Sequence, residues 1–218
     1  MSEYTRPECW AGTTSRGSRA MGDEANGVDE GECKSIVRCP WARMEPEIGY
    51  HDREWGVPER DDARLFELLT LEGAQAGLSW RTVLLKRDGY RALFAGFDPT
   101  IVATFDDVRI DELAGDPRIV RHRGKIAATV RNAAAYLALQ RAHGSFAAYL
   151  WAFVDDTPIV TRREAGDDPP ATTPLAERIS RDLRGRGFTF VGPTIVYAFL
   201  QASGVVDDHR ASCFRAIQ

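Results

Sequence analysis

The stretch from Arg186 to Cys213 constrains the fold of this chain most, because it contains an unusually clear helix start. Gly192 and Pro193 lead directly into the apolar run Ile195 to Ala202, and proline is favoured at the first position of a helix. Free backbone N–H groups at such a start lie at the positive end of the helix dipole and attract phosphate groups. We therefore expect an apolar helix whose N-terminus binds an anion.

Helix-capping residues recur along the rest of the chain, and each precedes apolar residues at helical spacing. The expected helices run from Asp61 or Asp62 to about Ala76, from Ser79 to Phe94, from Thr100 to Phe105 behind Asp98-Pro99, from Asp106 or Asp107 to Leu113, from Gly124 to Gln140, from Ser145 to Val154, and onward from Thr173-Pro174. No segment shows the alternating pattern of a strand, and no internal repeat is present. The sequence predicts an all-α fold with two helical lobes.

The N-terminal part of the chain differs in composition from the rest. Residues 1–36 are rich in Gly, Ser, Thr, Asp and Glu and show neither helical nor strand periodicity. This composition favours a disordered leader. We expect one helical domain over residues 37–218, for which a content of 44% hydrophobic residues supplies an adequate core.

The charge distribution is uneven. The formal net charge is −4, yet residues 118–131 hold five Lys or Arg residues and no acid. A second basic cluster precedes Gly192 and contains Arg178, Arg181, Arg184 and Arg186. Each cluster is either a solvated face or a track for nucleic-acid phosphates, and the helix start next to the second cluster favours the phosphate track.

Hydropathy and the number of cysteines indicate the cellular compartment of the protein. No apolar run approaches the ~18 residues of a membrane helix, and the N-terminus lacks the apolar core of a secretory signal. The four cysteines, Cys9, Cys33, Cys39 and Cys213, are too scattered for a secreted disulfide scaffold. These features predict a cytoplasmic protein that makes no contact with a membrane.

Two cysteines and two histidines of the expected domain could bind one metal ion. His209 and Cys213 are four residues apart, which would place both on one face of a helical turn. Cys39 and His51 would complete a closed Cys2His2 set of the structural zinc type that joins the start of the domain to its end. The alternative is that both cysteines are ordinary buried thiols and both histidines satisfy hydrogen bonds in the core.

Glu72 shares one stripe of its expected helix with Leu65, Leu69 and Ala76. A carboxylate among apolar neighbours is costly without a partner, which indicates a pocket for a polar or cationic group. The alternatives are a wet groove or an ion pair with an arginine. Tyr50 and Trp80 provide aromatic rings on which a flat ligand could stack, although either could equally belong to the core.

Seven segments in the same order resemble 3-methyladenine DNA glycosylase I and together span nearly all of residues 37–214. They are RCPW (38–41), YHDREWGVP (50–58), LEGAQAGLSW (71–80), RHRGKI (121–126), LWAFV (150–154), RGFTFVGPT (186–194) and VVDDHRASC (205–213). The resemblance implies a helix-hairpin-helix DNA glycosylase fold and a monofunctional enzyme that excises 3-methyladenine from alkylated double-stranded DNA as a monomer associated with the nucleoid.

The resemblance also implies roles for individual residues. Glu72 would hydrogen-bond the methylated base and serve the reaction, while Tyr50 and Trp80 would line the base pocket. Gly192 and Thr194 would contact DNA within the hairpin at residues 190–194. The zinc ligands would be Cys39, His51, His209 and Cys213.

Two departures from the family pattern are visible. A further pocket tyrosine is expected two residues before Tyr50, but the chain reads Pro46-Glu47-Ile48-Gly49 there. One aromatic wall is therefore missing or is supplied from elsewhere. Asp207 and Asp208 occupy the place of the catalytic aspartate of many related glycosylases. Either one of them has a chemical role, or they cap a helix ahead of His209, and we favour the cap.

Other functions remain open at this point. A zinc-stabilised, non-catalytic helix-hairpin-helix module would bind DNA without needing Glu72 and Trp80 in a pocket. A helical domain for protein partners would show no salt-dependent affinity for DNA. A lyase step would need an activated lysine, and the chain has only Lys34, Lys86 and Lys125, none of them beside the expected hairpin.

Overall fold

A computed structural model describes residues 36–217, which fall within one compact unit. The expected leader, apart from Ile36, lies outside the described residues. The helices are α1 (Glu47–Arg53), α2 (Asp62–Gln75), α3 (Trp80–Leu84), α4 (Arg87–Leu93), α5 (Pro99–Val102), α6 (Asp107–Gly115), α7 (Arg123–His143), α8 (Phe146–Trp151), α9 (Pro174–Gly185) and α10 (Pro193–Ala202). Short 3-10 helices are η1 (Ala95–Phe97), η2 (Ala152–Val154) and η3 (Phe214–Ile217). The predominantly helical fold is confirmed.

Helices begin at the capping residues that the sequence predicted. The predicted caps whose side chains accept a backbone N–H at a helix start are Asp61, Ser79, Asp98, Asp106, Ser145 and Thr173. His122, which the sequence did not predict as a cap, does the same at the start of α7. The single helix expected from Ser79 to Phe94 is wrong, since it breaks at Leu85 and Lys86 into α3 and α4. Helix α1 was not expected, because no side chain caps its start at Pro46.

The expectation of no strand is also wrong in detail. Two short strands, β1 (Ile159–Val160) and β2 (Val206–Asp207), pair in parallel. Strands of two residues cannot display an alternating pattern, so the sequence carried no periodic signal for them. Their pairing joins the loop after α8 to the segment after α10.

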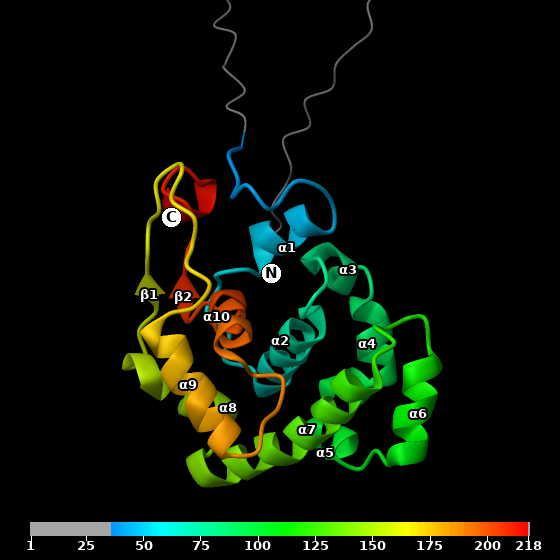
Figure 1. The fold of residues 1–218 in the computed structure, drawn as a ribbon. Coiled ribbons are helices and arrows are strands. Elements are labelled where there is room, and N and C mark those ends of the chain that lie inside the picture. Colours follow the sequence, from blue (N-terminus) through cyan, green and yellow to red (C-terminus); the bar gives the residue numbers. More distant parts are fainter. Residues whose placement is uncertain (1–35, 218) are drawn as a thin grey trace, which may run out of the picture. The chain divides into compact units, whose positions relative to one another are not determined.

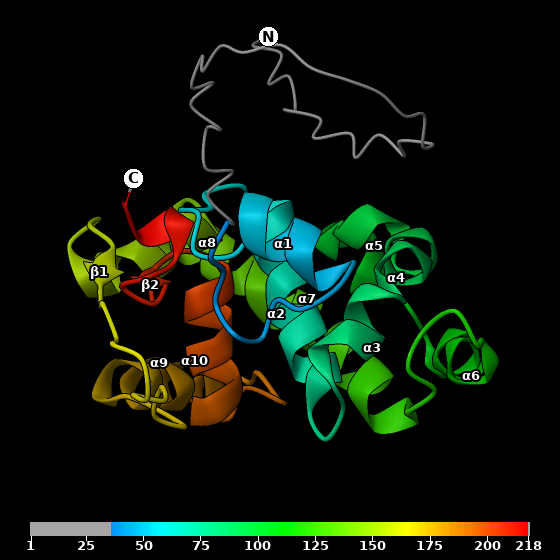
Figure 2. The same cartoon turned by 90° about the horizontal axis from the view of Figure 1, so that it is seen from above.

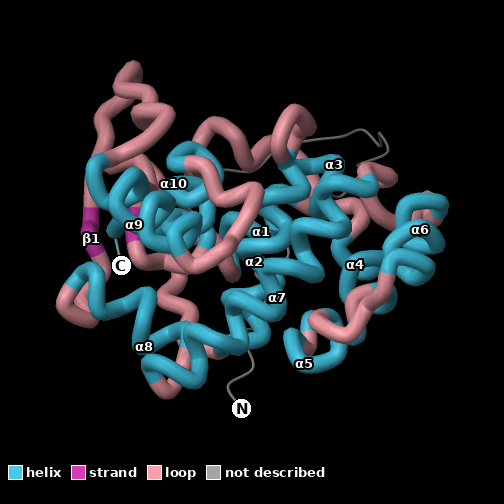
Figure 3. Tube along the Cα trace, turned by 60° about the horizontal axis from the view of Figure 1, so that its bottom comes forward, coloured by secondary structure: helices cyan, strands magenta, loops and turns pink. Residues whose placement is uncertain are grey.

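Helices α2 and α7 lie between two groups of elements (Figures 1 and 2). One group contains α9, α10 and the two strands, and the other contains α3 to α6, an arrangement that the tube view repeats (Figure 3). Helix α2 contacts α10 of the first group and α3 of the second, and it also contacts α7 and α8. The two groups thus face each other across α2, the helix that carries Glu72.

The core fixes α2 at its N-terminal end. Tyr136 of α7 stacks on Phe146 of α8 with ring centroids 4.1 Å apart, and its hydroxyl donates to the Asp62 carbonyl over 2.6 Å. The Asp62 carboxylate accepts the backbone N–H groups of Phe146 and Ala147 at 2.9 and 2.8 Å. These bonds cap α8 with a side chain from α2 and fix the two helices relative to each other.

Candidate active site and metal centre

An aromatic cavity of about 310 Å³ lies between α1, α2, α3 and α10. We call it the aromatic cavity, and its lining residues are Trp41, Glu47, Tyr50, Trp55, Glu72, Gln75, Trp80, Ala198 and Gln201. Its size falls at the lower end of the about 300–1,000 Å³ typical of small-molecule sites. The structure thus brings the predicted residues Tyr50, Glu72 and Trp80 together in one cavity.

Glu72 is buried in the wall of this cavity with only 5% of its surface exposed. None of the described residues forms a hydrogen bond or an ion pair with its carboxylate. Burial raises the pKa of Glu72 to about 8, because a charged carboxylate loses its hydration there. The expected alternative of a pairing with arginine is therefore not found among the described residues.

The pairing with arginine belongs instead to Glu67, five residues earlier on α2. The buried Arg87 guanidinium donates to Glu67 Oε1 over 2.6 Å and to Glu54 over 2.8 and 3.0 Å. Burial alone would lower the pKa of Arg87, but these carboxylates raise it. Arg87 also lies 5.8 Å from the centroid of the Tyr50 ring. The ion pairs thus hold α1, α2 and α4 together behind the aromatic cavity.

Tyr50 and Trp80 contribute polar atoms as well as rings. Their ring centroids are 5.2 Å apart, and both the Tyr50 hydroxyl and the Trp80 indole N–H are buried without a hydrogen-bond partner. Burial, and next the charge of Glu72, raise the pKa of Tyr50 well above its usual value. Two unsatisfied buried donors beside an unpaired carboxylate are costly, which indicates that a polar ligand completes the site.

A missing aromatic wall is not a feature of this cavity. Position 48 carries Ile, but Trp41 and Trp55 also line the cavity, and their ring centroids are 5.2 Å apart. Sequence reasoning missed both tryptophans and Gln201, although the RCPW and REWG segments that carry the tryptophans were part of the resemblance. Their position in the sequence close to the predicted metal ligands Cys39 and His51 was the available signal.

A second cavity of about 300 Å³ adjoins the aromatic cavity and shares Glu72, Gln75 and Ala198 with it. It is also lined by Gly77 and Leu78, in the turn after α2, and by Thr194 in the first turn of α10. Gly77 has φ +79°, a conformation that glycine adopts without strain. Gly192 is the N-cap of α10. The predicted DNA-contact residues therefore lie beside this second cavity.

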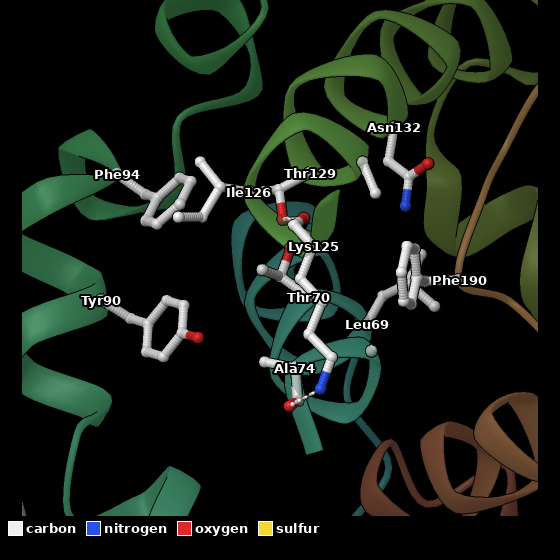
Figure 4. Close-up of a pocket in the computed structure, with 12 residues that line it drawn as sticks. Leu69, Thr70, Ala74, Tyr90, Phe94, Lys125, Ile126, Thr129, Asn132 and Phe190 are labelled. Atoms are coloured by element: carbon white, nitrogen blue, oxygen red, sulfur yellow. Dashed lines mark hydrogen bonds between the residues drawn. The ribbon is translucent and has the colours of Figure 1, made fainter. Parts of the chain in front are cut away.

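Helix α7 supports two segments that lie next to the second cavity. Figure 4 draws a different pocket, between α2, α4 and α7, in which the Lys125 side chain extends to the carbonyl of Ala74. The Lys125 ammonium donates to the carbonyls of Ala74 and Ala76 over 2.9 and 2.6 Å. About two turns further along α7, the Asn132 amide donates to the Thr189 carbonyl over 2.9 Å and accepts the Thr189 N–H over 2.8 Å. Lys125 thus fixes the end of α2, and Asn132 fixes the loop before Gly192.

Three of the four predicted metal ligands form a buried cluster. The ligand atoms of Cys39, His51 and Cys213 all lie within 4.8 Å of one another, and His51 Nε2 is 3.4 Å from Cys213 Sγ. Burial raises the pKa of Cys39 to about 12 and lowers the pKa of His51. The donor set of two sulfurs and one imidazole suits a tetrahedral zinc ion.

The fourth predicted ligand, His209, lies next to this cluster. Its ring centroid is 5.1 Å from that of His51, and its Nε2 atom is buried without a hydrogen-bond partner. The other ring nitrogens of the two histidines contact carboxylates, His51 Nδ1 to Asp52 over 2.8 Å and His209 Nδ1 to Asp207 over 2.7 Å. Carboxylates in that position orient histidine ligands and leave Nε2 free for a metal.

Two expectations about this segment are wrong. Residues 208–212 form no helix, so a shared helical face is not what brings His209 and Cys213 together, and the aspartates do not cap a helix. Asp207 accepts from the backbone N–H of His209 over 3.1 Å as well as contacting its ring. Asp208 is buried and contacts Tyr197, Gln201 and Thr161.

The two basic clusters differ in the structure. Arg118 forms an ion pair with Asp116, and Arg123 pairs with Asp107 and Asp111. Their charge is thereby partly neutralised, so the first cluster offers less positive charge than its sequence indicates. In the second cluster, Arg186 pairs with Asp182 over 2.6 Å, whereas Arg181 and Arg184 are exposed and no described acid pairs with them. Within the described residues, no helix combines the length and apolar character needed to cross a lipid bilayer.

Comparison with known families places this architecture. The family model for methyladenine glycosylases matches residues 41–216. The chain belongs to the methyladenine glycosylase family.

Individual members of the methyladenine glycosylase family are similar over most of their length. DNA-3-methyladenine glycosylase 1 of Escherichia coli (strain K12) is 48% identical over 179 residues, which cover 82% of this chain and 96% of that protein. A crystal structure of 3-methyladenine DNA glycosylase I has a TM-score of 0.79 at 48% identity and covers 82% of this chain and 98% of its own. A variant of such an enzyme in complex with 3-methyladenine has a TM-score of 0.78 at 39% identity, with 81% and 96% covered.

Proposed function

We propose that this chain is a DNA repair glycosylase that excises 3-methyladenine from alkylated DNA by hydrolysing the N-glycosidic bond and leaving an abasic site. The observation that carries the proposal is the unpaired, buried carboxylate of Glu72 in an aromatic cavity. Support comes from the similar proteins, which are named as DNA-3-methyladenine glycosylases, and from the relative that was crystallised with 3-methyladenine.

The reaction demands little general acid catalysis. Methylation at N3 gives adenine a positive charge, so the base leaves readily without protonation. The protein must extrude the nucleotide, which costs a few kcal/mol and least for a damaged base, and must hold the base while water reaches the sugar carbon. The aromatic cavity holds the extruded base, so selectivity arises from recognition of that base.

Glu72 recognises the charge of the methylated base. A neutral adenine gains little from a carboxylate, whereas a cationic base forms charge-assisted hydrogen bonds that are roughly twice as strong as neutral ones. Binding of the cation also favours the ionised form of Glu72, which the empty cavity disfavours. The side chain therefore discriminates alkylated adenine from the excess of normal adenine and stabilises the base as it departs.

Tyr50 and Trp80 hold the plane of the base. Stacking between a base and an aromatic ring contributes about 1–3 kcal/mol per base. The unpartnered Tyr50 hydroxyl and Trp80 N–H offer hydrogen bonds to the rim of the bound base. Together with Glu72 they form the substrate-binding set.

Helices α9 and α10 with the loop between them act as the helix-hairpin-helix element. The loop has positive φ at Gly187 and Phe190, and Ser180 of α9 donates to the Val191 carbonyl over 2.6 Å. The backbone at Gly192 and Thr194, at the N-terminus of α10, holds a DNA phosphate, with the exposed Arg181 and Arg184 nearby in sequence to add positive charge.

The enzyme is monofunctional. The two described lysines are both occupied, since Lys125 donates to the end of α2 and Lys86 donates to the Pro117 carbonyl over 2.5 Å. Neither lines the aromatic cavity. A Schiff-base step would need a free amine there, so borohydride should trap no covalent adduct with DNA.

Zinc bound by Cys39, His51, His209 and Cys213 would complete the fold. The residues fit this ion, because three of the ligand atoms cluster within 4.8 Å, the buried Nε2 of His209 lacks a partner among the described residues, and carboxylates orient both histidines. Four protein ligands would leave no position for water, so the ion would be structural.

The deciding experiment is chromatography of the free bases that the purified protein releases from methylated duplex DNA. We expect release of 3-methyladenine, with 7-methylguanine left in the DNA. Release of both bases would show that the cavity does not select by shape. No release by folded, zinc-loaded protein would overturn the proposal in favour of a non-catalytic DNA-binding module.

A further inference from the structure

Gln201 lines the same cavity as Glu72, and the fold restricts how its amide can be oriented. Its side-chain Nε2 donates to Asp208 Oδ2 over 2.7 Å. No hydrogen bond to its side-chain Oε1 is formed by the described residues. Gln201 therefore presents a hydrogen-bond acceptor that the protein itself does not use.

Asp208 enforces this orientation of the amide. The carboxylate is buried and contacts the hydroxyls of Thr161 and Tyr197, and the Arg163 guanidinium is 3.7 Å away. An ionised carboxylate only accepts hydrogen bonds. If the Gln201 amide turned over, its oxygen would face the carboxylate oxygens of Asp208, so the NH₂ group must point to Asp208.

We propose that Gln201 is a specificity-determining residue that selects purines with an amino group at position 6, and that Asp208 is the positioning residue that fixes its amide. Adenine carries an N–H₂ donor at this position, whereas guanine carries an oxygen acceptor. A 6-amino group can donate a hydrogen bond to the Gln201 oxygen. A 6-oxo group is itself an acceptor, so its oxygen would face the Gln201 oxygen and no hydrogen bond would form. The inference rests on the proposed function and names a determinant of its substrate class.

This role differs from that of Glu72. Glu72 responds to the positive charge of a methylated base, while the Gln201 oxygen responds to the hydrogen-bonding pattern of its edge. A pocket with Glu72 alone would retain cationic purines of either pattern. Asp208 reaches the base only through Gln201, since it does not line the aromatic cavity.

The test compares the binding of free 3-methyladenine and 3-methylhypoxanthine, measured by quenching of tryptophan fluorescence. The wild-type protein should prefer 3-methyladenine. Gln201→Met keeps the length of the side chain without an acceptor, and we expect about a tenfold loss of 3-methyladenine affinity, typical of one hydrogen bond, with no loss for 3-methylhypoxanthine. An unchanged preference in Gln201→Met would overturn the proposal.

Asp208→Asn tests the positioning role. An asparagine amide can both donate and accept, so the Gln201 amide becomes free to turn, and the preference for the 6-amino base should fall while Gln201 is intact. In the Gln201→Met background, Asp208→Asn should cause no further change in the preference, and a further change would show that Asp208 acts independently of Gln201. Equal zinc content and melting temperature exclude an effect through the neighbouring His209.

Two outcomes separate this inference from the proposed function. If the wild-type protein releases 3-methyladenine from DNA but binds both free bases equally, the selection by Gln201 is wrong and the glycosylase activity stands, whether or not any variant folds. If the wild-type protein neither releases nor binds 3-methyladenine, the proposed function itself fails.

Discussion

Glu72 lowers the stability of the fold at neutral and alkaline pH, because its carboxylate is buried without a partner among the described residues. Its pKa is raised from 4.5 to about 8 by burial, so the folded protein holds this proton more tightly than the unfolded chain. The free energy of unfolding therefore falls as the pH rises from about 4.5 to about 8, and the loss is complete above that range. At neutral and alkaline pH, the side chain that we propose to bind the substrate therefore opposes folding.

Replacing Glu72 by glutamine should remove this cost. We expect Glu72→Gln to melt at a higher temperature than the wild type at pH 9, by an amount that corresponds to a few kcal/mol, and to match it more closely at pH 5. Thermal unfolding at pH 5, 7 and 9 measures the difference. Glu67→Gln is the matched control on the same helix, because it breaks a buried ion pair with Arg87 and should destabilise by about 3–5 kcal/mol.

One result of the unfolding experiment would contradict this prediction. A Glu72→Gln variant that melts below the wild type at pH 9 would show that the carboxylate is stabilised by the fold and is not held ready for a ligand.

The same pKa predicts the pH dependence of excision. The dependence of kcat/KM on pH reports groups of the free enzyme, and recognition of a cationic base requires ionised Glu72. We expect kcat/KM for 3-methyladenine excision to rise with pH up to about 8 and then to level off. The pKa seen in kcat should be lower, because the bound cation favours the ionised form.

Single-turnover rates from pH 5.5 to 9 on DNA that contains 3-methyladenine, measured at subsaturating enzyme so that they report kcat/KM, test this profile. Glu72→Gln should give a low rate without this inflection. An inflection near pH 8 that survives in Glu72→Gln would assign it to another group.

At the scale of elements, α7 controls the geometry of the site without entering it. Lys125 holds the carbonyls at the end of α2 and so fixes the turn at Gly77 and Leu78 beside the second cavity. Lys125→Met should leave these carbonyls without a charged donor and loosen the turn. Because a displacement of about 1 Å can cost a hundredfold in rate, we expect excision from DNA to fall about ten- to hundredfold while the affinity for free 3-methyladenine stays within about twofold.

Hydrogen exchange at residues 76–79, measured together with excision rates, tests the role of Lys125. Lys86→Met is the control, since Lys86 donates to a carbonyl outside both cavities. Exchange and excision at wild-type levels in Lys125→Met would remove α7 from this role.

The sequence could predict those parts of the fold and of the site that depend on interactions between residues close together in the chain. The caps at Asp61, Ser79 and Asp106 act within three residues, so their helices were predictable. Helix α1 has no capping side chain, and its place depends on long-range contacts such as Arg87 to Glu54. The parallel pairing of β1 with β2 joins residues 47 positions apart and leaves no local pattern.

The candidate site follows the same division. The apolar stripe on α2 predicted that Glu72 is buried, but it could not decide between a ligand and an arginine, because the arginine that might pair with it lies on another helix and pairs with Glu67. The spacing of His209 and Cys213 predicted two metal ligands for a wrong reason, since the chain there forms turns and not a helix. Gln201 and Asp208 meet only because α10 and the segment after it fold back on each other.

At the scale of the whole domain, the candidate metal cluster brings the two ends of the described chain together. Cys39 and His51 lie near its start, and His209 and Cys213 lie near its end, where the Phe214 N–H also donates to the Val37 carbonyl over 2.9 Å. A bond across a loop this long restricts the unfolded chain strongly. The cluster also reaches the active site, because His51 follows Tyr50 directly in α1.

Removal of the metal should therefore affect stability and base recognition together. We expect one zinc ion per chain by elemental analysis, and after stripping with a chelator we expect a lower melting temperature and weaker binding of 3-methyladenine, as α1 loses the anchor beside Tyr50. His209→Asn should reduce the zinc content and reproduce both effects, whereas His143→Asn, which changes a histidine far from the cluster in sequence, should reproduce neither. Full zinc content in His209→Asn would contradict its assignment as the fourth ligand. Zinc loss with unchanged base affinity would limit the metal to holding the chain ends together and would leave the position of Tyr50 to the ion pairs of Arg87.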